Sequence, residues 1–148
     1  MDSRYEVEFK VRGDDFLAAG EASNQIKETL IMLGVPSPIS RRASVITYEA
    51  EMNLVIHSGG GILRAIITPE KLTIEAKDQG PGIPDLDLAM REGFSTASDK
   101  VREMGFGAGM GLPNIKRNSD CLQIDSLIGK GTILTATVFF HQGEGNRG

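Results

Sequence analysis

Apolar and polar residues alternate near the start of the chain and then change to a helical period. From Tyr5 to Val11 every second residue is apolar and the residues between are charged, which predicts a half-buried strand at the edge of a sheet. Residues 13–15 then supply chemistry typical of a helix start, and apolar residues follow at helical spacing as far as Leu33. This pattern predicts a first helix, with Gly34 as its C-terminal cap.

The rest of the chain switches between the same two periods. The further predicted elements are a second helix from near Ser40 to about Ser58, strands at 62–68, 72–76, 121–127 and 132–140, a short helix at 85–91 and a helix that begins at Leu112 and Pro113. Together they predict an α+β fold, a two-layer α/β sandwich with a mixed, mostly antiparallel sheet and helices on one face.

Length and composition indicate one globular domain. The 148 residues are 40% hydrophobic and 24% charged, so we expect a single domain at 1–148, with a core at about 4–140 and a disordered tail at 141–148. The net charge of -4 argues against nucleic-acid binding, and the single cysteine excludes an intramolecular disulfide. No apolar run approaches the roughly 20 residues of a membrane span. The N-terminus lacks a signal-peptide core, so a cytoplasmic protein is expected.

The second predicted helix carries a carboxylate and a carboxamide on one face. Glu49 and Asn53 are four residues apart, so their side chains are neighbours on a helix. Oxygen ligands of this kind suit magnesium and can hold a water or hydroxyl beside it. A solvated polar stripe is the more common explanation of such a pair, so the spacing alone leaves both interpretations open.

The stretch AKDQGPGIPD, residues 76–85, places a carboxylate directly after a predicted strand. Gly80 and Gly82 allow the main chain to approach a flat ligand closely, and an ionised Asp78 can only accept hydrogen bonds. Adenine offers an exocyclic amine to such an acceptor, whereas guanine offers a carbonyl oxygen. The alternative is a tight turn capped by aspartate, which is common.

A second glycine-rich stretch, GFGAGMGLPNIK, runs from Gly105 to Lys116 and leads into the Pro113 helix. Successive N–H groups and the positive end of that helix favour a phosphate group. The spacing matches neither the Walker A loop nor the dinucleotide fingerprint, and a flexible linker is the alternative. Gly131 and Thr132 open the last strand, where a hydroxyl can reach Asp78 through water, although a simple turn explains that pair better.

The order of these features resembles that of the Bergerat-fold (GHKL) ATPases over about Phe16 to Phe140. E-x-x-x-N precedes D-x-G-x-G, a glycine-rich lid follows, and G-x-G-T opens the last strand. DQGPGIPD, GFST and GAGMGLPNIKR resemble in particular the bacterial serine kinases of partner-switching systems, which are anti-sigma factors and stressosome switch kinases. A histidine kinase is not expected, because the sequence shows no dimerisation helices with a phosphoacceptor histidine.

The resemblance implies an ATP-dependent protein-serine kinase that uses ATP and Mg²⁺. Glu49 then resembles the carboxylate that orients the incoming hydroxyl, Asn53 the magnesium ligand, and Asp78 the acceptor of the adenine amine. The other implied nucleotide contacts are Gly80, Gly82, Ile83, Gly105, Gly107, Ala108, Gly109, Met110, Gly111, Leu112 and Thr132. Lys100 or Arg102 in the lid is a further candidate for the terminal phosphate, although two basic residues in a loop are usually solvated.

The resemblance also implies partners. The expected substrate is a STAS-domain antagonist, whose phosphorylation would release the protein to bind a sigma factor or a metal-dependent serine phosphatase. Two alternatives remain open: a non-catalytic anti-sigma binding module that uses ATP and ADP as a switch, and a stand-alone ATPase or sensor. Homodimer formation through the first strand and helix is left open as well.

Overall fold

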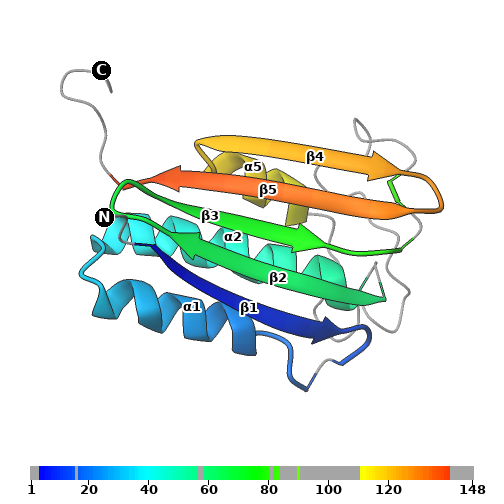
Figure 1. Ribbon diagram of the computed structural model, residues 1–148, viewed down its shortest axis with the longest axis horizontal. Coiled ribbons are helices and arrows are strands. Elements are labelled where there is room, and N and C mark those ends of the chain that lie inside the picture. The colour runs from blue at the N-terminus through cyan, green and yellow to red at the C-terminus, as the bar shows by residue number, and fades with distance from the viewer. Residues whose placement is uncertain are drawn as a thin grey trace.

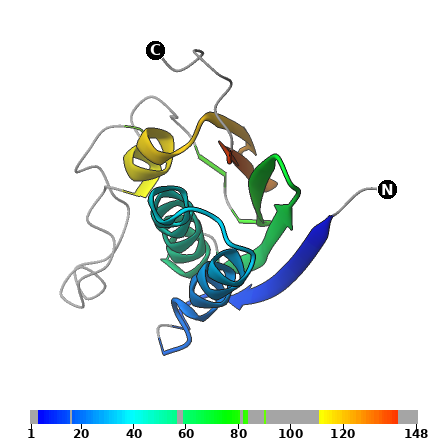
Figure 2. The ribbon, with the colours of Figure 1, turned by 90° about the vertical axis from the view of Figure 1, so that its left-hand side faces the viewer.

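The computed structural model describes residues 4–15, 17–56, 59–80, 82–83, 90 and 111–140. Within this part of the chain, five strands form one sheet in the order β1-β2-β3-β5-β4. The described helices all lie on one face of that sheet (Figures 1 and 2). The elements in chain order are β1 (Tyr5–Arg12), α1 (Glu21–Met32), α2 (Ser37–Ile56), β2 (Gly60–Ile67), β3 (Lys71–Lys77), α5 (Gly111–Asn118), β4 (Cys121–Leu127) and β5 (Gly131–Phe139).

The two-layer α+β sandwich predicted from the sequence is confirmed. All neighbouring strands among the described residues pair antiparallel, so this part of the sheet lacks the parallel pair that a mixed sheet would contain. Its edge strand β1 pairs with β2 alone, as the alternation of its residues predicted. The residues of β3 alternate in the predicted sense too, because Leu72, Ile74 and Ala76 are buried between more exposed neighbours.

The hydrophobic core lies between the sheet and the helices. Side chains of α1 and α2 meet the inward-facing residues of β2 and β3, and Ile115 of α5 is fully buried beside them. Burial of such aliphatic side chains stabilises a fold by about 1.5–3 kcal/mol each relative to exposure. The largest fully buried aliphatic side chains are Ile26, Leu30, Ile46, Leu54, Val55, Leu63, Leu72, Ile74, Ile115 and Val138.

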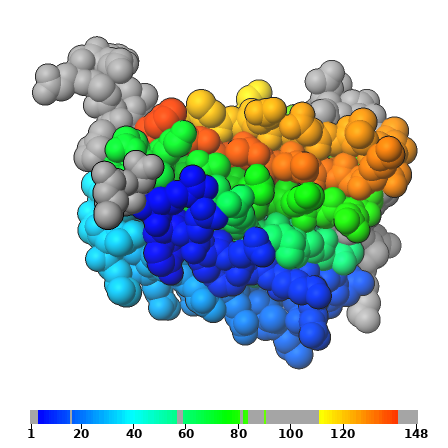
Figure 3. Space-filling model, in the orientation of Figure 1, coloured from blue at the N-terminus to red at the C-terminus, as the bar shows by residue number. Residues whose placement is uncertain are grey.

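The opposite face of the sheet carries charged and polar side chains and is turned to the viewer in Figures 1 and 3. Arg64 of β2 lies between Glu6 of β1 and Glu75 of β3 and forms ion pairs with both. The hydrogen bond between Arg64 and Glu6 lowers the pKa of Glu6 and raises the pKa of Arg64. Since these groups are solvated, the pairs add little stability.

The first helix begins later than its sequence pattern predicted. The predicted start at 13–15 forms a turn instead, in which Oδ1 of Asp15 accepts a hydrogen bond from the Ala18 N–H at 3.3 Å. Helix α1 begins at Glu21, after Gly20 in a left-handed conformation with φ 100°. Asp15 therefore stabilises a local turn, which competes with the helix for the same backbone N–H groups.

The end of α1 agrees with the sequence prediction. Gly34 has a φ of 79°, which a residue without Cβ adopts without strain. The N–H of Gly34 donates to the carbonyl oxygen of Ile31, and the N–H of Val35 donates to that of Leu30. These two bonds form a Schellman cap.

Helix α2 begins at Ser37, three residues before the predicted start, and ends at Ile56. Pro38 was predicted to lie in a loop but occupies the first turn of α2. Its missing N–H is not needed there, because the first N–H groups of a helix have no intrahelical acceptor. The predicted strand ends agree with the structure within two residues.

Several predictions fall outside the described residues. They concern the short helix at 85–91, of which Met90 alone is described, the glycine-rich segment before Gly111, and the tail at 141–148. Among the described helices, none is long and apolar enough to cross a membrane.

Candidate functional site

Strand β3 ends directly before Asp78, whose side chain closes the turn that follows. Oδ1 of Asp78 accepts hydrogen bonds from the N–H of Gly80 at 2.8 Å and from the N–H of Thr132 at 3.3 Å. Within the described residues, no hydrogen bond reaches the other oxygen, Oδ2. Half of this carboxylate therefore remains as a hydrogen-bond acceptor.

The start of β5 approaches Asp78 so closely that only glycine fits at its first position. Gly131 has a φ of 123°, and a Cβ atom there would lie 2.2 Å from the carbonyl oxygen of Asp78. The next residue, Thr132, reaches Asp78 through its backbone, while its hydroxyl oxygen lies 2.9 Å from Oγ of Ser126. That this hydroxyl also reaches Asp78 or adenine through water stays a prediction, and no pattern in the sequence indicated its contact with Ser126.

Gly82 and Ile83 lie against the hairpin formed by β4 and β5. The N–H of Ile83 donates to Oγ of Ser126 at 2.7 Å. Gly82 has a φ of 81°, and a Cβ atom there would lie 2.6 Å from the carbonyl oxygen of Leu127. Close approach of two parts of the chain therefore requires glycine at this position, while the approach of a ligand to Gly82 stays a prediction.

Glu49 and Asn53 lie on the side of α2 that faces the start of α5. A Cβ atom on Gly111 would lie 3.2 Å from Oδ1 of Asn53 and 3.5 Å from Oε1 of Glu49. Oε2 of Glu49 accepts a hydrogen bond from Nδ2 of Asn114 at 3.0 Å. A carboxylate, a carboxamide oxygen and a helix N-terminus therefore converge, and Glu49 and Asn53 are both half-buried. Asn114 stands in the quoted glycine-rich motif, but no spacing indicated this contact.

The start of strand β2 lies between the residues around Asp78 and the α2 residues Glu49 and Asn53. A Cβ atom on Gly61 would lie 2.3 Å from the carbonyl oxygen of Lys77, 2.9 Å from Cδ2 of Leu54 and 3.2 Å from Cα of Asp78. The ends of α2 and β3 therefore meet at Gly61, and both point to the same side of the molecule in Figure 1. Asn53, next to Leu54, and Asp78 belong to one region.

A comparison with protein families decides what this region belongs to. The model of the histidine kinase-, DNA gyrase B- and HSP90-like ATPases matches residues 40–142, which include Glu49, Asn53, Asp78 and Thr132. The chain belongs to this ATPase family. Membership implies the use of ATP and confirms the resemblance to Bergerat-fold ATPases that the order of the motifs indicated.

Curated relatives lie in the switch-kinase branch. The serine/threonine-protein kinase RsbT of Bacillus subtilis (strain 168) is 31% identical to this ATPase over 126 residues, which are 82% of this chain and 86% of that protein. The anti-sigma F factor of Caldanaerobacter subterraneus subsp. tengcongensis is 36% identical over 96 residues, which are 62% of this chain and 64% of that protein. The resemblance to this branch is therefore confirmed as well.

Solved structures share the fold. The crystal structure of the SiaB-SiaC complex from Pseudomonas aeruginosa matches with a TM-score of 0.57 and 13% identity, over 89% of this chain and 88% of that one. The mycobacterial sensor histidine kinase MprB matches with a TM-score of 0.51 and 16% identity, over 91% of this chain and 97% of that one.

The structure describes part of the predicted site of this ATPase. Of the predicted site residues, it describes Glu49, Asn53, Asp78, Gly80, Gly82, Ile83, Gly111, Leu112 and Thr132. Outside the described residues lie Gly105, Gly107, Ala108, Gly109, Met110, Lys100 and Arg102. The described residues therefore include the predicted adenine-binding side of the site and Glu49 and Asn53 of α2, but not the predicted glycine-rich lid before Gly111.

The residues around Asn53 fit a magnesium ion. Mg²⁺ prefers oxygen ligands and usually keeps waters and substrate phosphates, so a protein supplies one or two groups. Oδ1 of Asn53 is a ligand of this kind, and it lies 3.2 Å from the Cβ position of Gly111 at the start of α5. The described part of the chain holds no group of three or more His, Cys, Asp or Glu side chains arranged to bind a metal ion. The single carboxamide oxygen of Asn53 would therefore supply one ligand, beside phosphates and water.

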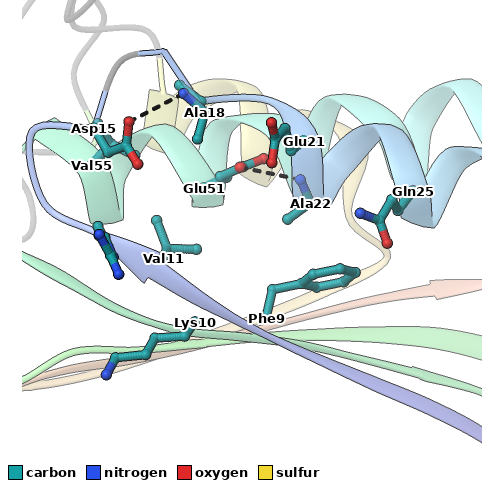
Figure 4. A pocket seen from close by; sticks show the side chains of 12 residues that line it. Phe9, Lys10, Val11, Asp15, Ala18, Glu21, Ala22, Gln25, Glu51 and Val55 are labelled. Atoms are coloured by element: carbon teal, nitrogen blue, oxygen red, sulfur yellow. Dashed lines mark hydrogen bonds between the residues drawn. The ribbon is translucent and has the colours of Figure 1, made fainter.

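A separate cavity of about 160 Å³ lies between β1, α1 and α2 (Figure 4). Glu51 lines it and is 3% exposed. Its carboxylate accepts hydrogen bonds from the N–H groups of Gly20, Ala22 and Ser23 at 3.1, 3.3 and 3.0 Å. Glu51 thus caps the N-terminus of α1. Its role is structural, although it lies only two residues from Glu49.

Proposed function

We propose that this ATPase is a cytoplasmic serine protein kinase of a partner-switching system, which transfers the γ-phosphoryl group of ATP to a STAS-domain partner. The named kinase among its relatives supports this proposal. The observation that carries it is the convergence of Glu49, Asn53 and the start of α5. A protein that only held a nucleotide would have no use for a carboxylate at that place.

In the proposed complex, the exocyclic amine of adenine donates a hydrogen bond to Asp78. Oδ2 accepts it, because Oδ1 is already used by Gly80 and Thr132. A guanine carbonyl oxygen would face the carboxylate instead, so like partial charges disfavour that base. The other described residues proposed to contact the nucleotide are Gly80, Gly82, Ile83, Thr132, Gly111 and Leu112. The last two begin a helix whose N–H groups favour phosphate.

Glu49 is proposed to act on the serine hydroxyl. The serine oxygen attacks the γ-phosphorus while the bond to the β–γ bridging oxygen breaks, and Glu49 accepts the serine proton. Phosphoserine and ADP result. Asn53 would hold Mg²⁺, which supplies positive charge to the phosphates when bound. Positioning and charge stabilisation account for most of the rate enhancement in such transfers.

A non-catalytic anti-sigma module is the second candidate, because relatives named anti-sigma F factor match 62% of this chain. ATP and ADP would then change only its affinity for a sigma factor. In the kinase proposal, phosphorylation of the antagonist releases the protein for a sigma factor or a metal-dependent serine phosphatase. A stand-alone ATPase or sensor would release phosphate steadily without any protein partner.

The deciding experiment measures transfer from γ-radiolabelled ATP to the STAS-domain proteins of the same organism, with phosphoserine mapped by mass spectrometry. We expect transfer by the wild type and by the control Glu28→Ala, which changes an exposed glutamate on α1. Glu49→Ala should bind ATP normally and lose transfer by about 10²–10⁴-fold, the usual contribution of a general base.

The other outcomes are distinct. Transfer by Glu49→Ala at the wild-type rate would remove Glu49 from the reaction. ATP binding without transfer to any STAS-domain protein would favour the anti-sigma module, and phosphate release without a partner would favour the stand-alone ATPase. A wild type that fails to bind ATP would overturn all three.

A further inference from the structure

Asn114 is the one described side chain that donates a hydrogen bond to Glu49. Its Nδ2 lies 3.0 Å from Oε2 of Glu49, and the two residues are 65 positions apart. Its Oδ1 accepts a hydrogen bond from a terminal nitrogen of Arg117 at 2.6 Å. Because the guanidinium can only donate, the carbonyl side of the Asn114 amide must face Arg117, and the NH₂ side must face Glu49.

Helix α5 is held firmly enough to make this contact directional. Ile115, the neighbour of Asn114, is fully buried in the core. At the other end of the helix, Nε of Arg42 donates to the carbonyl oxygen of Asn118 at 3.1 Å, and its terminal nitrogen binds Oδ1 of Asp120 at 3.1 Å. Arg42 and Glu49 both belong to α2. Core packing and two polar contacts therefore dock α5 on α2, with Asn114 placed over the carboxylate.

Because of the hydrogen bond from Asn114, the two carboxylate oxygens of Glu49 have different surroundings. Oε2 binds Asn114, whereas Oε1 lies on the side of Gly111, whose Cβ position is 3.5 Å from Oε1 and 3.2 Å from Oδ1 of Asn53. Of the two carboxylate oxygens, Oε1 is therefore the one nearer to the start of α5, where Oδ1 of Asn53, the proposed magnesium ligand, also lies. Glutamate is a rotamer-rich side chain, and on a half-buried helix face its carboxylate would otherwise sample several orientations.

We infer that Asn114 is a positioning residue, which fixes the Glu49 carboxylate so that Oε1 receives the proton of the serine hydroxyl. The inference rests on the proposed kinase function. Arg117 orients the Asn114 amide, Asn114 orients the carboxylate, and the carboxylate aligns the hydroxyl. Since Asn114 belongs to the helix that follows the glycine-rich segment, the reactive carboxylate is in place only while that helix is docked on α2.

The test compares Asn114→Ala and Asn114→Asp with the control Asn118→Ala. Asn118 lies one turn further along α5, and within the described residues its Nδ2 donates to the carbonyl oxygen of Asn114 and not to Glu49. Single-turnover transfer at saturating ATP and partner should fall about 10- to 100-fold in Asn114→Ala, in keeping with the effect of a small misplacement. Aspartate has nearly the same volume as asparagine, but its charge repels Glu49. The transfer rate of Asn114→Asp should therefore fall at least as far as that of Asn114→Ala.

Three readouts separate positioning from a structural role. The Kd for ATP and the thermal unfolding midpoint of Asn114→Ala should stay close to those of Asn118→Ala. In a Glu49→Ala background, Asn114→Ala should cause no further loss of rate, because the group that it positions is absent. The side-chain amide NMR signals of Asn114 should shift in Glu49→Gln and stay in place in Glu28→Gln.

The failures are distinguishable. Wild-type transfer rates in Asn114→Ala, or a full additional loss in the Glu49→Ala background, would overturn the positioning role and leave the kinase proposal intact. If the wild type transfers no phosphoryl group to any STAS-domain protein, the proposed function fails and the positioning role is overturned with it.

Discussion

Asp78 and Thr132 are joined by two hydrogen bonds across the ends of β3 and β5. The N–H of Asp78 donates to the carbonyl oxygen of Thr132 at 3.0 Å, and the N–H of Thr132 donates to Oδ1 of Asp78 at 3.3 Å. The first bond continues the ladder of the sheet, and the second fixes the carboxylate. Oδ2 is left to accept the hydrogen bond that the proposed function assigns to the adenine amine.

Replacement of Asp78 by asparagine should weaken ATP binding without unfolding the protein. The asparagine oxygen can keep the bonds from Gly80 and Thr132, while its NH₂ group replaces Oδ2 and confronts the adenine amine. An unsatisfied buried polar group costs about 1–3 kcal/mol, which corresponds to a roughly 5- to 150-fold loss of affinity. Isothermal titration with ATP measures it.

Asp125→Asn is the matched control, because Asp125 is exposed on β4 and should bind ATP like the wild type. Unchanged affinity in Asp78→Asn would exclude Asp78 from the site. A loss of affinity that is equal in both variants would point to net charge rather than to the adenine contact.

The two glycines of the β4–β5 turn should respond differently to alanine. Both have positive φ values, 79° at Gly129 and 123° at Gly131, so each alanine is strained by about 1–2 kcal/mol. The Cβ position of Gly129 is open, whereas that of Gly131 meets the backbone of Asp78. Overpacking adds about 1–3 kcal/mol, so Gly131→Ala should lower the free energy of unfolding more, as urea titration can measure.

The same pair reports on the site. Gly131→Ala displaces Asp78 and should also reduce ATP affinity, whereas Gly129→Ala should leave it unchanged. Equal stability of the two variants would contradict the close approach of β5 to Asp78.

Glu51→Gln should destabilise the protein while sparing the site. The carboxylate receives three backbone N–H groups from the start of α1, and glutamine would turn an NH₂ group toward at least one of them. An unpaired buried donor costs about 1–3 kcal/mol, so the urea midpoint should fall. Glu28→Gln, an exposed change on α1, is the control, and a wild-type midpoint in Glu51→Gln would refute the capping role.

The phenol of Tyr48 should titrate above its ordinary range. Burial raises the pKa of Tyr48, and the negative charges of Glu49 and Glu51 raise it further. The chain has two tyrosines, so Tyr5→Phe leaves Tyr48 as the single source of tyrosinate absorbance. Its midpoint should lie above about 10, the value of a free tyrosine, and should fall when Glu49→Gln removes one charge.

The raised pKa of Tyr48 also makes the stability of the fold depend on pH. A raised folded-state pKa means that the unfolded chain loses the Tyr48 proton first, so stability is lost as the pH rises from about 10 through the folded pKa. If the titration midpoint of Tyr48 is the same in Glu49→Gln as in the protein with Glu49, the Glu49 carboxylate does not raise the pKa of Tyr48.

The sequence by itself determined most of the local structure of this protein. Alternation fixed β1 and β3, because a strand with one buried face must place apolar residues at every second position. Gly34 marked the end of α1 for a similarly local reason, the left-handed conformation of its cap. The spacing of Glu49 and Asn53 placed them on one helix face, and the order of the motifs indicated the ATPase family that the comparisons confirmed.

Tertiary structure alone decided which distant groups meet. Asn114 reaches Glu49, Ser126 reaches Ile83, and Gly131 touches Asp78, although no pattern along the chain links the members of each pair. Glu51 and Glu49 look alike in the sequence, yet one caps α1 in the core and the other faces α5. The physical reason is that periodicity depends on neighbours along the chain, whereas these contacts depend on how α2, α5 and the sheet pack together.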